Sequence, residues 1–207
     1  MPNSPMPSMN SENHENRPLS IETVLAARET ALKWHDLIPN PKYPLFAETV
    51  ERLFLDLNRY QPTKVLETGS GLTSALLRKF YHGGEVHTVE SDPYWLAKTF
   101  KICTRMAVAC TNFFHWHPFK NDTEKYGTYD YIIHDMGDME TRKKTLNEVL
   151  MFAAPTCVIL LDNFGVSGYK AYANRIVRQQ GFVSHYPPNP MTLSIDKAGA
   201  FAIFGRK

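Results

Sequence analysis

Short apolar segments alternate with helical segments along this 207-residue chain from Lys64 onward. Residues 64–67, 86–90, 113–116, 129–134, 157–161, 182–185 and 200–204 are expected to be strands, and residues 72–81, 93–109, 140–152 and 168–180 helices. Strands that alternate with helices form right-handed parallel crossovers. The alternation therefore predicts an α/β fold with a doubly wound, mostly parallel sheet of seven strands.

The last two predicted strands have no helix between them. Their linking segment contains Pro187, Pro188 and Pro190, and proline is incompatible with a helix interior. We therefore expect the strands at 182–185 and 200–204 to form an antiparallel pair. A plain dinucleotide-binding fold would continue to alternate with helices, so this C-terminal pair distinguishes between two classes of α/β protein.

The N-terminal part of the chain differs from the rest. Residues 1–18 are rich in Pro, Asn, Ser and Met and are predicted to be a disordered tail. Ser20 is expected to cap a helix that runs to about residue 36, and a second helix is expected over residues 45–59. Residues 19–207 are thus predicted to be a single domain, in which N-terminal helices (19–60) precede a Rossmann-like core (61–207).

Composition excludes several classes of protein. The formal net charge is +2 and no run of basic residues occurs, so no nucleic-acid partner is expected. No apolar stretch has the length of a membrane span, and no signal peptide pattern opens the chain. The odd cysteine count (Cys103, Cys110 and Cys157) argues against a disulfide framework, so a cytoplasmic location is expected. Cys103 and Cys110 are expected to lie on one face of a helix. The partner expected is a small-molecule acceptor, and a homodimer is a possible assembly of the chain.

A glycine-containing loop, Glu67-Thr68-Gly69-Ser70-Gly71, joins the first predicted strand of the core to the following helix. Glycines allow a sharp turn and close approach of a ligand, and the helix N-terminus directs backbone N–H groups to the same place. Glu90 ends the next strand and is followed by Ser91. An acidic residue at that position can accept both hydroxyls of a ribose, so loop and acid together predict a nucleoside site.

Two nucleoside ligands suit such a site. A nicotinamide cofactor brings an anionic pyrophosphate, whereas S-adenosylmethionine brings a sulfonium and an ammonium group. Glu67 directly precedes the loop, where its carboxylate would repel a pyrophosphate and attract a cationic ligand. This difference favours S-adenosylmethionine.

Acidic and amide side chains follow two further strands. Asp135 ends the fourth strand of the core, and Asp162 and Asn163 end the fifth. These ends border the ligand crevice of an open α/β sheet, and three oxygen donors there could form part of an octahedral Mg²⁺ shell. The alternative is that Asp162 and Asn163 cap the next helix and that Asp135 positions a substrate without metal.

The loop, Glu90 and the terminal strand pair resemble the class I S-adenosylmethionine-dependent methyltransferases over residues 64–207. The acidic residues resemble those of the catechol and caffeoyl-coenzyme A O-methyltransferases. The resemblance implies that Asp135, Asp162 and Asn163 bind the metal and that N-terminal helices cover the site, here with residues 34–46. The cofactor residues that it and the loop indicate are Glu67, Gly69, Ser70, Gly71, Glu90, Ser91, Trp95, Trp116, His117 and Asp135.

This chain departs from the pattern at two positions. Thr73 stands where the family's loop often has a further glycine, and Asp138 stands where the catechol enzymes have a lysine that acts as the base. Asp135 and Asp138 are therefore the catalytic candidates, and Lys143 and Lys144 are later alternatives for the base.

The leading hypothesis is a methyltransferase (EC 2.1.1.-) that uses S-adenosylmethionine, with possible assistance from Mg²⁺, to methylate the oxygen of a small hydroxylated molecule. The alternatives are a metal-independent N- or O-methyltransferase with a larger acceptor, a nicotinamide-dependent oxidoreductase and a non-catalytic binding module. No covalent nucleophile is needed for methyl transfer, and the chain carries no Gly-x-Ser-x-Gly motif.

Overall fold

A computed structural model describes residues 18–35, 47–184 and 202–206. The predicted N-terminal tail, most of the predicted cover (36–46) and the linker before the last strand lie outside these ranges. Within them, no helix is long and apolar enough to cross a membrane.

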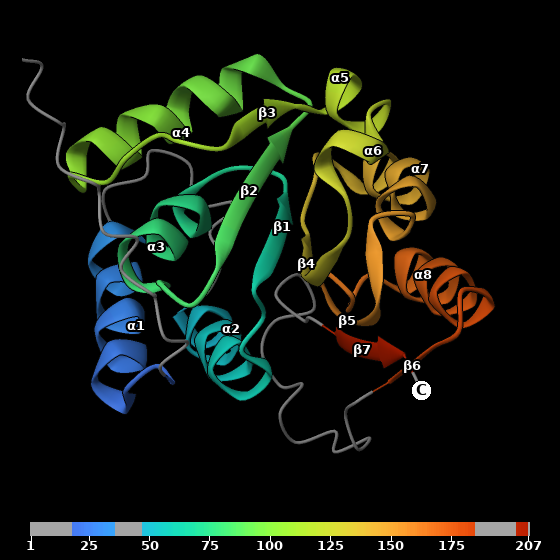
Figure 1. Ribbon diagram of the computed structural model, residues 1–207, viewed down its shortest axis with the longest axis horizontal. Coiled ribbons are helices and arrows are strands. Elements are labelled where there is room, and N and C mark those ends of the chain that lie inside the picture. Colours follow the sequence, from blue (N-terminus) through green and yellow to red (C-terminus); the bar gives the residue numbers. More distant parts are fainter. Residues whose placement is uncertain (1–17, 36–46, 185–201, 207) are drawn as a thin grey trace, which may run out of the picture.

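A seven-stranded sheet organises the described residues (Figure 1). Its spatial order is β3-β2-β1-β4-β5-β7-β6. The first five strands are parallel, and β7 runs antiparallel to both β5 and β6, so the predicted C-terminal pair is confirmed. The strands are β1 (Lys64–Thr68), β2 (Glu85–Glu90), β3 (Phe113–His115), β4 (Tyr129–His134), β5 (Ala153–Leu161), β6 (Phe182–Ser184) and β7 (Ala202–Arg206).

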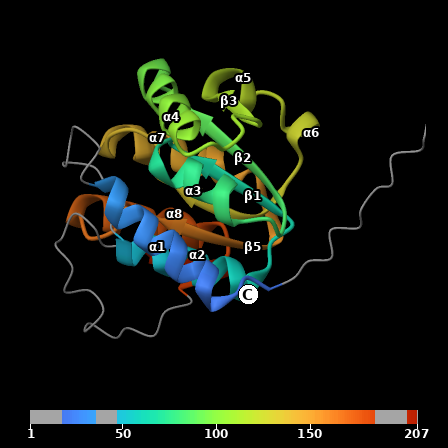
Figure 2. The ribbon, with the colours of Figure 1, turned by 90° about the vertical axis from the view of Figure 1, so that its left-hand side faces the viewer.

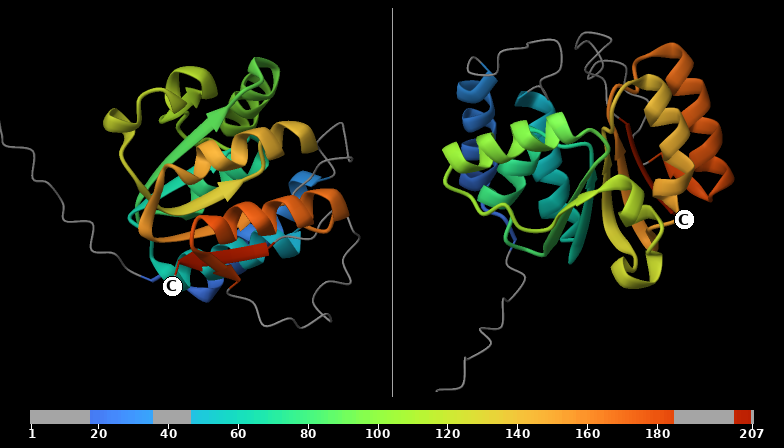
Figure 3. Two further views of the ribbon diagram at one scale, coloured as in Figure 1. Left: turned by 90° about the vertical axis from the view of Figure 1, so that its right-hand side faces the viewer. Right: turned by 90° about the horizontal axis from the view of Figure 1, so that it is seen from above.

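Helices cover both faces of this sheet. Viewed from above, α1 to α4 lie on one side and α7 and α8 on the other (Figure 3), and α1 packs on α2 and α3 (Figure 2). The longer helices are α1 (Ile21–His35), α2 (Ala47–Tyr60), α3 (Leu72–Phe80), α4 (Pro93–Arg105), α7 (Met139–Leu150) and α8 (Ser167–Gln179). The amide of Thr23 donates to Ser20 Oγ at 3.2 Å, as expected for the cap of α1.

The two faces of the sheet bury separate cores. Successive side chains of a strand point to opposite faces, so Tyr131 and Ile133 of β4 pack with the α1–α3 layer, whereas Ile132 packs with α7 and α8. Strands that are apolar on both faces are typical of a parallel sheet covered by helices. This burial fixes the register of β1 and β4, whose carboxyl ends form the centre of the candidate site.

Three local predictions were wrong. Helix α4 ends at Arg105, because Ala107 takes a left-handed conformation (φ 54°), and Cys110 therefore lies outside the helix that holds Cys103. Strand β3 ends at His115, one residue earlier than expected, because α5 (Trp116–Lys120) begins there. The short helix α6 (Thr123–Tyr126), capped by Asp122, was also not predicted.

Candidate functional site

The candidate residues gather where the parallel strands end. Backbone hydrogen bonds continue past the strands and join the loops to one another: Gly69 N–H donates to Val89 O (2.8 Å), Asp135 N–H to Thr68 O (2.8 Å) and Asp162 N–H to His134 O (3.2 Å). The chain reverses its strand order between β1 and β4, and the loops after these strands diverge there. In open α/β sheets this switch point is the place where ligands bind.

In the glycine loop, the backbone after β1 lies very close to the backbone after β4. Gly69 has φ +90°, and a Cβ on it would lie 2.4 Å from the carbonyl oxygen of Asp135. Only glycine satisfies both the backbone conformation and this contact. A Cβ on Gly71, in contrast, would meet nothing within 4 Å, so the loop is open on that side, next to the N-terminus of α3.

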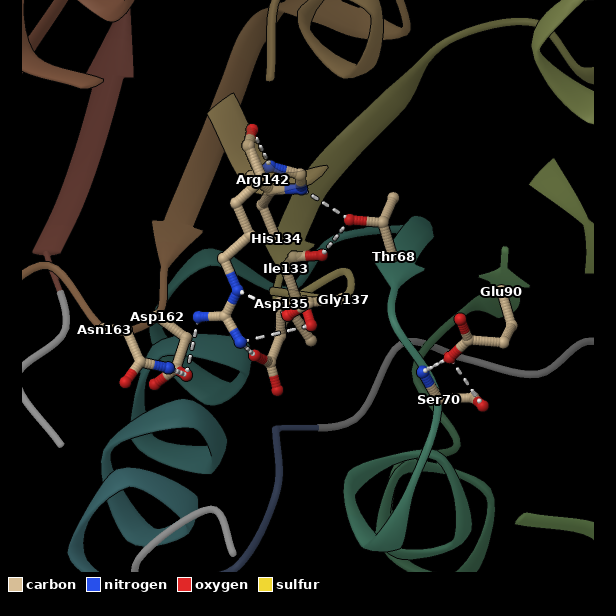
Figure 4. A network of polar contacts seen from close by, with 10 residues as sticks. All are labelled: Thr68, Ser70, Glu90, Ile133, His134, Asp135, Gly137, Arg142, Asp162 and Asn163. Carbon is tan, nitrogen blue, oxygen red and sulfur yellow. Dashed lines mark hydrogen bonds and ion pairs between the residues drawn. The ribbon is translucent and has the colours of Figure 1, made fainter. Parts of the chain in front are cut away.

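Glu90 is joined directly to this loop (Figure 4). Its Oε2 accepts hydrogen bonds from the backbone N–H of Ser70 (2.8 Å) and from Ser70 Oγ (3.0 Å). Its Oε1 accepts from the amides of Ser91 (2.7 Å) and Asp92 (2.9 Å). Ser91 Oγ also donates to Oε1, at 3.4 Å. A carboxylate has about four acceptor positions, so ligand hydroxyls that bind Glu90 would take the places of the rotatable hydroxyls of Ser70 and Ser91.

Glu67 lies beneath the loop. Its side chain is 2% exposed and accepts a hydrogen bond from Thr88 Oγ1 at 2.7 Å. Burial raises its pKa to about 7, against the opposing effects of the Thr88 hydrogen bond and of Arg78. At neutral pH Glu67 is therefore only partly ionised, which weakens the argument that its charge alone selects the ligand.

The predicted adenine contacts fall into two groups. Trp116 is 3% exposed and packs within the core on the α7–α8 side of the sheet, so its indole is not available as a stacking platform. His117 is exposed at the start of α5, and Trp95 is half-buried in the first turn of α4, with the Lys98 ammonium 4.5 Å from the centre of its ring. Of the three, His117 and Trp95 are accessible to a ligand.

A buried arginine joins the predicted metal ligands (Figure 4). Arg142, from α7, is 5% exposed and forms ion pairs with Asp135 Oδ1 and, at 3.2 Å, with Asp162 Oδ2. Its remaining contacts are to the carbonyl oxygens of Gly137 (3.3 Å) and Asp135 (3.4 Å). Burial raises the pKa of Asp135, and the Arg142 guanidinium opposes this rise.

These residues do not fit a divalent cation as they are arranged. Arg142 holds one oxygen of each carboxylate, and Asn163 donates from its amide nitrogen to Asp162 Oδ2, which turns the amide oxygen away from that carboxylate. Among the described residues, no group of three His, Cys, Asp or Glu side chains could hold a metal. Asp162 and Asn163 do not cap the next helix either, because the N-cap of α8 is Val166.

Asp138 occupies a structural position. It is the N-cap of α7, and its Oδ1 accepts the amide of Thr141 at 2.8 Å. This hydrogen bond lowers the pKa of its exposed carboxyl, which opposes a role as a general base. The alternative Lys143 pairs with Glu140 at 2.8 Å on the same helix, and Lys144 is exposed.

Two residues of the site, Arg142 and His134, were not predicted from the sequence. His134 is fully buried: its Nδ1 lies 2.7 Å from Thr68 Oγ1 and its Nε2 lies 3.1 Å from the carbonyl oxygen of Arg142. A carbonyl only accepts, so Nε2 carries the proton and Nδ1 accepts from Thr68. Burial lowers the pKa of His134 to about 4, so this neutral ring ties the end of β1 to α7. Arg142 directly precedes Lys143 and Lys144, so the sequence does not distinguish it from a solvent-exposed basic residue of the helix.

No family model and no curated protein sequence matches this chain, but solved structures do. The O-methyltransferase TomG from Streptomyces achromogenes, solved with SAM, has a TM-score of 0.61 at 14% identity and covers 87% of this chain and 89% of its own. Cofactor-bound Rv0187 from MTB has a TM-score of 0.61 at 19% identity (91% and 97%). An O-methyltransferase from Bacillus cereus in complex with SAH has a TM-score of 0.59 at 15% identity (91% and 92%). These similarities lie in the fold, and they confirm the predicted class I methyltransferase fold.

Proposed function

We propose that this chain is an S-adenosylmethionine-dependent methyltransferase that methylates a hydroxyl group of a small molecule. The observation that carries the proposal is the junction of Glu90 with the open glycine loop at the switch point of a methyltransferase fold. Two of the similar solved structures, TomG and the Bacillus cereus enzyme, are described as O-methyltransferases, which supports oxygen as the acceptor atom.

The residues at this site suit the parts of that cofactor. Glu90 would accept the ribose hydroxyls, and the N-terminus of α3 behind Gly71 would receive the carboxylate of the methionine moiety. His117, at the start of α5 after β3, and Trp95, in the first turn of α4 after β2, are the candidates for the adenine. When bound, the cofactor supplies an activated methyl group, so the protein has to align the acceptor, exclude water and receive its proton. Asp135, which is partly exposed beside Gly69, is the candidate carboxylate for that proton.

The competing nicotinamide-dependent oxidoreductase is disfavoured by the sheet itself. Dinucleotide-binding folds continue with parallel strands, whereas β7 here inserts antiparallel between β5 and β6. S-adenosylmethionine is therefore favoured over a nicotinamide cofactor by the topology of the sheet rather than by the charge of Glu67.

Calorimetry with S-adenosylhomocysteine tests the proposal. We expect saturable binding to the wild type and an affinity lower by about tenfold to a hundredfold in Glu90→Ala, since hydrogen bonds to a charged group contribute about 1.5–3 kcal/mol. Glu85→Ala removes a carboxylate from the opposite end of the same strand and is expected to bind like the wild type.

Two results would contradict the proposal. Equal affinity of Glu90→Ala and wild type would remove Glu90 from the site, and tighter binding of NAD than of S-adenosylhomocysteine would favour the oxidoreductase. Release of S-adenosylhomocysteine from S-adenosylmethionine in the presence of hydroxylated acceptors, but not of amines, would separate O-methylation from N-methylation. Binding without turnover over a broad set of acceptors would leave a non-catalytic module.

A further inference from the structure

Arg142 contacts two of the three predicted metal ligands, Asp135 and Asp162. The guanidinium extends from α7 between the ends of β4 and β5 and contacts Asp135 on one side and Asp162 on the other (Figure 4). Its backbone is fixed as well, because the carbonyl oxygen of Arg142 accepts from buried His134. An arginine held at both ends and 5% exposed is a permanent part of the cluster rather than a mobile surface charge.

The contacts of Arg142 use the oxygens that a cation would need. A divalent cation such as Mg²⁺ requires several oxygens converging at about 2.0–2.1 Å in octahedral geometry. Here Asp135 Oδ1 and Asp162 Oδ2 are paired with guanidinium nitrogens, and Asp162 Oδ2 also accepts from the Asn163 amide nitrogen. The opposite orientation of that amide would bring its oxygen against a carboxylate, so the hydrogen bonding determines which way it points.

The charge of the cluster leads to the same conclusion. When both carboxylates are ionised, the two carboxylates and one guanidinium carry a single net negative charge, whereas the two carboxylates alone would carry two. A divalent ion bound at the remaining oxygens would lie beside the positive charge of Arg142 in a poorly solvated place, where like charges repel strongly. Arg142 thus offsets part of the negative charge of the cluster and repels a second cation.

We propose that Arg142 is a built-in replacement for the divalent cation at the Asp135–Asp162–Asn163 cluster, so that this cluster binds no metal and methyl transfer proceeds without one. Arg142 is a positioning residue: it holds the ends of β4 and β5 together as a metal would, but it leaves no coordination position for an acceptor oxygen. Acceptors that depend on chelation by a metal, such as catechols held through both oxygens, are therefore disfavoured. The catalytic part of this inference rests on the proposed function, whereas the metal-binding part does not.

Titration with Mn²⁺ followed by electron paramagnetic resonance tests the inference directly, because Mn²⁺ takes the same oxygen ligands as Mg²⁺. The wild type is expected to show no saturable site below about 1 mM, which is weaker than typical protein sites for such ions. Arg142→Gln removes the charge but keeps an amide donor, and we expect it to bind one Mn²⁺ at least about tenfold more tightly than the wild type. Adding Asp162→Asn to Arg142→Gln is expected to abolish the gained site.

Two control variants make the result specific. Lys143→Gln removes a neighbouring positive charge from the same helix without touching the cluster and is expected to remain like the wild type. Arg142→Lys keeps the charge and is expected to bind no Mn²⁺, which keeps the inference testable even if Arg142→Gln does not fold. Circular dichroism establishes which variants are folded.

Three outcomes would overturn the inference: a wild-type Mn²⁺ site that Asp162→Asn removes, a folded Arg142→Gln variant with no gain in Mn²⁺ binding, or Mn²⁺ binding to Arg142→Lys. Calorimetry with S-adenosylhomocysteine in the presence of a chelator is run in parallel. Loss of that binding in the wild type even with added Mg²⁺ would refute the proposed function, but the Mn²⁺ titration would still decide the role of Arg142.

Discussion

At the scale of single residues, the two glycines of the loop have different physical roles. Gly69 is required by the fold, because it combines φ +90° with a carbonyl oxygen 2.4 Å from the position of a Cβ. Gly71 has an extended φ of 170° that any residue can adopt, and its Cβ position is open. The fold therefore does not require glycine at position 71, but a ligand bound next to this residue would leave no room for a larger side chain.

This difference predicts opposite behaviour for two alanine variants. Gly69→Ala should lower the free energy of unfolding by about 2 kcal/mol or more, since strain and backbone overlap act together. Gly71→Ala should change it by less than about 0.5 kcal/mol but weaken binding of S-adenosylhomocysteine, because its methyl group enters the space next to the N-terminus of α3. Urea unfolding and calorimetry measure the two effects. Equal stability of both variants would contradict the role given to Gly69.

At the scale of elements, α7 has the largest consequences for the site. Its N-terminus is closed by Asp138, its first turns carry Arg142 into the acidic cluster, and it is tied to β1 through His134 and Thr68. The helix therefore determines which groups face the crevice. It also determines which side chains are already engaged in hydrogen bonds or ion pairs and are not free to act as catalysts there.

The position of Asp138 as the cap of α7 leads to a prediction that separates capping from base catalysis. Asparagine caps a helix as well as aspartate does, whereas alanine does not. Asp138→Asn should thus keep most of the thermal stability and the methyltransferase activity, while Asp138→Ala should lower the midpoint of thermal unfolding. If Asp138 were the base, both variants would lose kcat to a similar degree at unchanged KM.

The elements of this fold could be predicted where periodicity carries the information. The five parallel strands and the helices α3, α4 and α7 between them were expected because apolar runs and helical spacing alternate over long segments, and the terminal pair because prolines exclude a helix. Helices α5 and α6 were missed because elements of five and four residues are too short to show a period. The early end of α4 depends on the left-handed conformation of Ala107. Alanine rarely adopts this conformation, so the sequence did not predict the end of the helix there.

The candidate site was predictable only in part for a similar reason. Glu90 and the loop could be placed because each directly follows a strand, so that topology alone brings them together. Arg142 could not be placed, because its role depends on which face of α7 turns toward β4 and β5 and on the spacing between two carboxylates. A metal site and an arginine-bridged cluster require the same acidic residues, and they differ by one side chain from another element.

At the scale of the whole molecule, two buried ionisable groups act on stability in opposite directions. Burial raises the pKa of Glu67 from 4.5 to about 7 and lowers the pKa of His134 from 6.5 to about 4. Glu67 retains a proton in the folded state that it has lost in the unfolded chain, so acidification from pH 7 to 4.5 favours folding. His134 gains a proton only in the unfolded chain over most of its range, so acidification from pH 6.5 to 4 favours unfolding.

Since the two windows overlap, the two contributions largely cancel in the wild type, and single substitutions should reveal them. Each shift corresponds to roughly 3–4 kcal/mol over its full range. The stability of Glu67→Gln minus that of the wild type should therefore be higher at pH 7.5 than at pH 5, by about 2 kcal/mol. The same difference for His134→Gln should be higher at pH 5 than at pH 7.5. Urea unfolding at both pH values gives the four differences.

The sign of each change is what tests the structure, because other carboxylates alter the stability of wild type and variants alike. His82→Gln removes an exposed imidazole and is the matched control for His134→Gln. A pH-independent difference for His134→Gln would mean that this ring is solvated and does not bridge β1 and α7. In that case the Arg142 carbonyl oxygen would lose its hydrogen bond, whereas the ion pairs of the Arg142 guanidinium with Asp135 and Asp162 do not depend on that contact.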